Sequence, residues 1–142
     1  MDNIIKIGNL LGKTKITLQK LLKIERKKTE ILEQGSVEEL NNLINSEQAL
    51  IMECSSIEKQ RVKLCRELDI DSITELFEKY PESKQAISPI HNELNTLVKE
   101  LKKISGLNMR LLDTRLKIVR FITSQMGFET ENPTYGKNAQ KT

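Results

Sequence analysis

Apolar residues in this chain recur in three long stripes, at alternating spacings of three and four residues. The stripes cover residues 4–32, 40–68 and 90–125. A repeat of about 3.5 residues is typical of helices that pack side by side. Such a stripe is stable in water only when another helix covers it. The pattern therefore favours a protein that holds helices, either its own or those of a partner.

The composition agrees with long helices. The chain has 142 residues, of which 30% are charged and 4% aromatic, and it has no Trp. Its length fits one domain, and so few aromatic side chains are unusual for a compact α/β core. Residues 1–34 carry a net charge of +4, residues 35–80 of −5 and residues 81–142 of +4. This order predicts that the acidic middle segment packs against both basic neighbours.

Turn signals divide the chain into helices. Gly35 ends the first helix, which is expected over residues 3–34. Ser36 and Glu39 have the spacing of a capping box, which predicts a second helix over residues 37–68. A loop this short makes the two helices antiparallel neighbours. Ser72 and Glu75 repeat the capping box before a short helix at residues 73–79.

The last long helix is expected to begin at Pro89, with Ser88 as its N-cap and a linker at residues 81–88. It ends near Met126, before Gly127, and the polar residues 128–142 are expected to be flexible. The predicted fold is therefore an all-α, elongated antiparallel bundle of three long helices and one short helix. Its parts are a helical domain, residues 1–127, and a C-terminal tail, residues 128–142.

Residues for catalysis or metal binding are scarce. His91 is the only histidine, and a lone His does not make a metal cluster. Cys54 and Cys65 lie about 16 Å apart on one predicted helix, which is too far for a disulfide. Free thiols suit a reducing cytoplasm. We expect no enzymatic activity, no cofactor and no metal.

Nucleic acid is not an expected partner either, because no strongly basic segment has interleaved aromatic residues.

The last helix carries a second apolar stripe beside its first. The members of this stripe are Met109, Leu112, Leu116, Val119 and Met126. Together the two stripes make more of the helix apolar than one neighbour needs. This predicts either a helix buried between two others or a surface for docking a partner. Asn108 lies on the first stripe, where Asn typically fixes register or hydrogen-bonds a backbone.

Two motifs and the helix order resemble the FlgN family of flagellar export chaperones. One motif is Asn108-x-x-Leu111-Leu112 and the residues after it, and the other is Thr134-Tyr135-Gly136. The resemblance implies a cytoplasmic, non-enzymatic chaperone that binds the C-terminal helical region of hook–filament junction proteins and delivers them to the export gate. It implies that the second stripe of the last helix binds the client, and that Tyr135 and Gly136 bind the export gate.

Two other functions fit parts of the sequence. A self-associating coiled-coil adapter would use the last helix to bind a second copy of the chain. A peripheral membrane protein would use the first helix, in which five lysines lie opposite an Ile/Leu face. No stretch reaches the ~18 uninterrupted apolar residues of a transmembrane helix, so stable membrane insertion is not expected.

Overall fold

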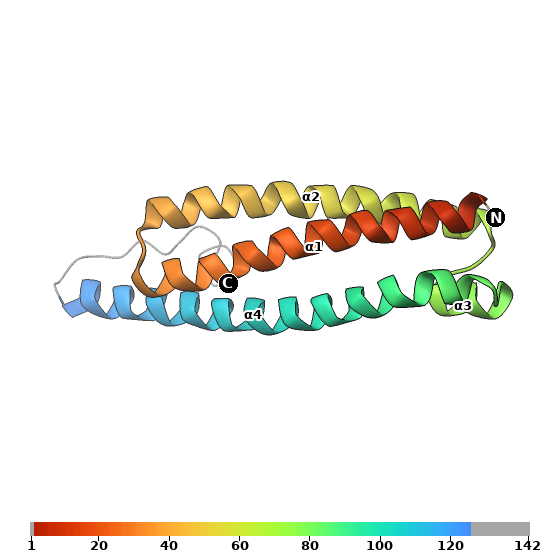
Figure 1. Ribbon diagram of the computed structural model, residues 1–142. Helices are drawn as coiled ribbons and strands as arrows, with labels where there is room; N and C mark the ends of the chain where they lie inside the picture. Colours follow the sequence, from red (N-terminus) through yellow and green to blue (C-terminus); the bar gives the residue numbers. More distant parts are fainter. Residues whose placement is uncertain (1, 126–142) are drawn as a thin grey trace, which may run out of the picture.

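The computed structural model describes residues 2–125, and this part of the chain contains four helices and no strand. The helices are α1 (Asp2–Gln34), α2 (Val37–Glu67), α3 (Ile73–Lys79) and α4 (Ser83–Gln125). The three long helices lie along one axis and form an elongated rod, in which α2 runs antiparallel to α1 and α4, and the short α3 lies at one end (Figure 1). The expected all-α bundle of three long helices and one short helix is confirmed.

The central helix of the rod is α1. Both α2 and α4 pack along it, while the backbones of α2 and α4 stay apart throughout the described residues (Figure 1). The expectation that the acidic segment packs against both basic neighbours is therefore only partly confirmed, because the long α2 packs along α1 and not along α4, while the short α3 contacts α4. The reason is that α1 has more apolar surface to bury than α2 has. Adjacent residues of α1 such as Leu21 and Leu22 are both buried and point to two sides of the helix, whereas α2 buries only Ile57 and Cys65. Burial of apolar surface outweighs exposed charge pairs, which contribute about 0–1 kcal/mol each.

The main core lies at the end of the rod where α1 begins. The first half of α1, the last part of α2, the short α3 and the start of α4 meet there. Ile7 and Leu76 are fully buried in this core, and Ile87 is 2% exposed. The first turns of α1 contain Gly8 and Gly12, which have low helix propensity, so this end of the helix depends on packing for its stability. Ile4 and Ile7 are buried, so this end of α1 is covered.

The turn between α1 and α2 has the predicted capping box. The Glu39 backbone N–H donates to Ser36 Oγ at 3.1 Å, and the Ser36 N–H donates to Glu39 Oε2 at 3.3 Å. The second predicted box is only half formed. Ser72 Oγ accepts from the Glu75 N–H, but the Glu75 carboxylate accepts from Asp71 instead of Ser72.

The break in the pattern after α2 is a Schellman motif. The Ile70 N–H donates to the Cys65 carbonyl at 2.9 Å, and the Asp69 N–H donates to the Arg66 carbonyl at 3.0 Å. Asp69 has a φ of 58°, the left-handed conformation that this motif requires. Ile70 is buried, so the motif also brings an apolar side chain back into the core.

The start of α4 differs from the prediction. Ser88 is not an N-cap and residues 83–88 are not a linker, because α4 begins at Ser83 and Pro89 lies inside it. Burial explains the difference, since Ser83 and Ile87 both pack inside the protein. Pro89 and Gln85, whose carbonyl would otherwise accept a hydrogen bond from residue 89, are both exposed, so water can solvate that carbonyl. Tertiary packing of Ile87 thus extends the helix past a local stop signal.

Candidate functional site

A buried polar layer joins α1 to α4 halfway along the rod. Asn108 is 3% exposed, and its Nδ2 donates to the Glu25 carbonyl at 2.9 Å and to Glu25 Oε2 at 2.6 Å. The Thr29 hydroxyl donates to Asn108 Oδ1 at 2.6 Å. No buried side-chain N or O atom in residues 2–125 lacks a hydrogen-bond partner. Asn108 therefore both fixes the register and bonds a backbone carbonyl, as its stripe position predicts.

The same layer reaches α2 through Lys28. Lys28 Nζ lies 3.1 Å from Glu47 Oε2 on α2 and 3.7 Å from Glu25 Oε1. Burial alone would raise the pKa of the Glu25 carboxyl, but its hydrogen bonds with Glu47 and Asn108 and the charge of Lys28 leave it below the ordinary value. Burial and the neighbouring Glu25 raise the pKa of Glu47. The layer therefore fixes the mutual position of all three long helices.

Arg115 sets the point on α4 where α1 ends. Its guanidinium donates to the carbonyls of Ile31 and Leu32 at 3.2 Å and to that of Gly35 at 2.9 Å. These carbonyls lie at the C-terminal end of α1, where no later turn of helix supplies donors and a positive charge is favoured. Arg115 is therefore level with the turn between α1 and α2.

Beyond Arg115, α4 continues without a helix beside it. Figure 1 shows α4 running past the turn between α1 and α2. We call residues 117–125 the overhang, and these nine residues of helix extend about 14 Å. Ile118 and Ile122 continue the stripe that faces α1, yet they are 54% and 49% exposed because α1 has already ended. Phe121, which is 64% exposed, adds an aromatic ring to this surface.

The predicted client-binding stripe lies on one side of the α1-facing residues of α4. Each residue of an α-helix is rotated by about 100° from the one before it. The members of the stripe therefore lie on the same side of α4 as Leu94, which is in the main core, and Leu101, which packs against that core. Leu112 and Leu116 are half-buried, while Met109 and Val119 are 70% and 55% exposed. Met126, Tyr135 and Gly136 lie outside the described residues. The sequence pattern placed Ile118 and Ile122 on the first stripe of the last helix and did not predict that they are exposed, although the length of the last helix relative to the first was a usable signal.

A second apolar line lies on the other side of α4. It is formed by Leu107, Ile118 and Phe121, and Leu107 is 39% exposed. Beside Leu107 is a groove of about 370 Å³ between α1 and α4, which we call the outer groove. The outer groove is lined by Leu22, Arg26, Glu100, Lys103, Ile104, Leu107 and Arg110.

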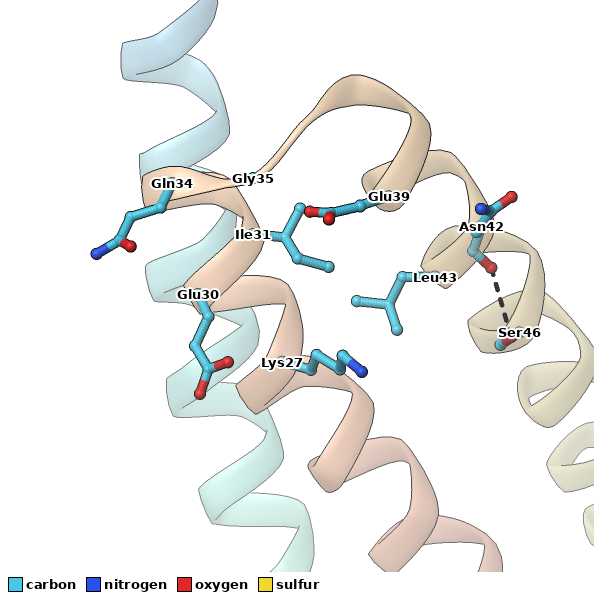
Figure 2. A pocket seen from close by; sticks show the side chains of 9 residues that line it. All are labelled: Lys27, Glu30, Ile31, Gln34, Gly35, Glu39, Asn42, Leu43 and Ser46. Carbon is cyan, nitrogen blue, oxygen red and sulfur yellow. Dashed lines mark hydrogen bonds between the residues drawn. The ribbon is translucent and has the colours of Figure 1, made fainter.

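A further groove separates α1 from α2 near their turn. Its volume is about 510 Å³. Figure 2 shows Ile31 and Leu43 facing each other across it, while Gln34 points away. The Ser46 hydroxyl donates to the Asn42 carbonyl along the α2 wall (Figure 2). These side chains form no pair of nucleophile and base, so this groove gives no indication of catalysis.

Three other features of the described residues bear on which kind of functional site this protein contains. No group of three or more His, Cys, Asp or Glu residues in residues 2–125 is placed to hold a metal ion. Burial raises the pKa of both thiols, Cys54 and Cys65, which makes them less reactive. Across the same range, none of the helices is both long enough and apolar enough to cross a membrane. The main surface feature is therefore the exposed apolar part of α4.

The fold and the candidate site place the protein in the class of elongated all-α bundles, with one long helix left partly uncovered. A family model described as FlgN protein matches residues 1–142, the whole chain. The chain belongs to the FlgN family, which is known as a family of flagellar export chaperones and not of enzymes. No curated protein and no solved structure matches the chain.

Proposed function

We propose that this protein is a cytoplasmic flagellar export chaperone. It binds the C-terminal helical region of hook–filament junction proteins, prevents their premature assembly and brings them to the export gate. The observation that carries this proposal is the uncovered apolar surface of α4, on which Met109 and Val119 are more than half exposed. Membership of the FlgN family supports the same function.

Two competing functions have weaker support. A membrane-surface helix would need the Ile/Leu face of α1, but in the described residues that face is buried against α2 and α4. A self-associating adapter would pair the uncovered surface of α4 with a second copy. Residues 102–125 carry six basic residues and one acidic residue, so pairing two such segments brings like charges together.

Replacing Leu112 or Leu116 with Asp should weaken client binding at least about tenfold, because a charge would enter an apolar contact. Val119→Asp should have a similar effect, and it tests the same stripe on the overhang, where no neighbouring helix depends on the side chain. The measurement is a calorimetric titration of the client's C-terminal segment into the full chain.

The matched control is Met52→Asp. Met52 is 71% exposed on α2, so this variant adds the same charge at an exposed apolar position of a different helix. It should bind the client as the parent chain does. Circular dichroism first establishes that each variant keeps its helicity. Unchanged client binding by folded Leu112→Asp, Leu116→Asp and Val119→Asp variants would show that this stripe is not the client site.

The export gate should contact a separate part of the chain. We assign this role to Tyr135 and Gly136, on the basis of the tail motif that resembles the FlgN family. An aromatic anchor often carries much of the binding energy of a small interface, and Gly lets a partner approach the backbone closely. Tyr135→Ala should therefore reduce binding to the soluble export-gate domain and leave folding and client binding unchanged. Equal gate binding by parent and variant, measured by titration, would make Tyr135 an incidental residue.

A further inference from the structure

The outer groove and exposed apolar residues of the overhang lie along the same side of α4, with basic side chains beside them. The apolar line of Leu107, Ile118 and Phe121 starts at the groove and ends near the tip of α4. This line is separate from the stripe of Leu112, Leu116 and Val119. Leu107 and Phe121 lie on the opposite side of the α1-facing residues from that stripe, and Ile118 lies at the edge of the α1-facing residues nearest to Leu107 and Phe121. A partner can therefore occupy it without using the proposed client stripe.

The groove lies on the side of α1 away from α2. Arg26 lines the groove, whereas Lys28 reaches Glu47 on α2. Residues two apart point to opposite sides of a helix. This position matters because residues 37–58 of α2 contain five Glu and no Lys or Arg. A partner in the outer groove is thus kept apart from the acidic half of α2.

The charges around the groove are mainly positive. Arg26 bonds Glu100 across the groove at 3.3 Å. Lys103 and Arg110 have no carboxylate within ion-pair distance in residues 2–125. Both side chains lie at the edge of the line that contains Leu107. An acidic residue beside the apolar face of a partner helix would meet these two cations directly.

We propose that this surface binds an acidic amphipathic helix of another protein. The length of α4 from Lys103 to Gln125 corresponds to about 33 Å, which a partner helix of about 20 residues would match. Ile104 and Leu107 take its apolar face at the groove, and Ile118 and Phe121 take it on the overhang. Lys103 and Arg110 pair with its carboxylates.

Segments of the chain itself fit this surface less well. The tail beyond the described residues contains two acidic and two basic residues between positions 126 and 142, so it has no net negative charge. The acidic part of α2 in a second copy offers Val37, Ile51 and Met52 as its exposed large apolar side chains. These residues do not form a continuous stripe, because Leu40, Leu43 and Leu50 are partly covered.

The test uses the full chain and two designed amphipathic peptides of about 20 residues, with identical Leu faces. One peptide has Glu at its polar positions and the other has Lys. At low salt the Glu peptide should bind at least about tenfold more tightly by fluorescence anisotropy. The difference should shrink as salt is raised, because the charges around the groove are exposed.

The double charge reversal Lys103→Glu with Arg110→Glu should remove the preference for the Glu peptide. The control is Lys59→Glu with Arg66→Glu, the same change at two exposed positions of α2, which should leave the preference intact. Leu107→Ala should weaken binding of both peptides, since it removes apolar contact and no charge. All variants are first checked for parental helicity.

Three results would overturn the proposal. The first is equal affinity for the two peptides. The second is loss of Glu-peptide binding in Leu112→Asp but not in the Lys103/Arg110 double variant, which would place the peptide on the client stripe. The third is a dimeric mass for the free chain that becomes monomeric in the double variant, which would make a second copy the occupant. The first and third results leave client binding by the other stripe untouched, and the second assigns the peptide to that stripe without testing the client itself, so the two proposals fail separately.

Discussion

Replacing Asn108 with Ala should lower the free energy of unfolding by about 2–4 kcal/mol. The amide donates to both the carbonyl and the carboxylate of Glu25, and it accepts from Thr29. Removing it takes a donor from two buried acceptors, one of them ionised, and an acceptor from Thr29, and a lost hydrogen bond contributes about 0.5–1.5 kcal/mol, or about 1.5–3 kcal/mol when one group is charged. Urea denaturation followed by circular dichroism measures the change.

The matched control for Asn108→Ala is Asn95→Ala. Asn95 is exposed on the same helix, so the same chemical change there should alter stability by less than about 0.5 kcal/mol. Asn108→Asp provides a second test of the polar layer, because it places a carboxylate next to the carboxylate of Glu25. Its loss of stability relative to the parent should be larger near pH 7 than near pH 4, because protonation of either carboxyl removes the repulsion and restores a donor. If Asn108→Ala and Asn95→Ala cost the same, the polar layer does not hold α1 and α4 in register.

Replacing Leu76 with Ala should lower the free energy of unfolding by about 2–5 kcal/mol. Leu76 is fully buried, and it packs in the core where α1, α2, α3 and α4 meet. The short α3 has two buried residues, Ile73 and Leu76, to hold it there. The truncation therefore leaves a cavity in the main core and also weakens the link between α2 and α4. Thermal and urea unfolding of the variant measure the effect.

Leu107→Ala is the control for this truncation. It makes the same change at a position that is 39% exposed, so it should cost less than about 1 kcal/mol. The same truncation should not affect binding at the other end of the rod.

Leu76→Ala should leave the affinity of the folded protein for a client unchanged, because the overhang lies at the opposite end from the main core (Figure 1). A loss below 1 kcal/mol for Leu76→Ala would mean that this core does not determine stability.

The proposed client surface shows how register leads to function. The polar layer of Asn108, Glu25, Lys28 and Glu47 fixes how α4 lies along α1. That register places Arg115 at the end of α1, so the apolar residues of the overhang, Ile118, Val119, Phe121 and Ile122, are exposed in the described chain. If α4 were shifted along α1 by one helical turn, about 5 Å more or less of this surface would be covered.

The amino-acid sequence determined the helices of this protein and its family. The spacing of apolar residues at three and four positions predicts three long helices, and Gly35, Ser36 and Glu39 mark the turn that the structure contains. These signals are local, because capping and helical periodicity depend on residues within a few positions of one another. The register role of Asn108 was likewise predictable, since a polar residue in an apolar stripe must find a partner.

Only the tertiary structure decided which helix is central, where α4 begins and which apolar residues stay uncovered. The basic, acidic, basic order of the three segments favoured α2 as the central helix. The structure has α1 as the central helix, because α1 buries side chains on two sides. Local rules favoured a start at Pro89, but burial of Ile87 moves it to Ser83. Ile118 and Ile122 belong to the stripe that faces α1, yet they are exposed because α1 ends first. Each outcome depends on contacts between residues far apart in the chain, and a pattern within one helix does not contain that information.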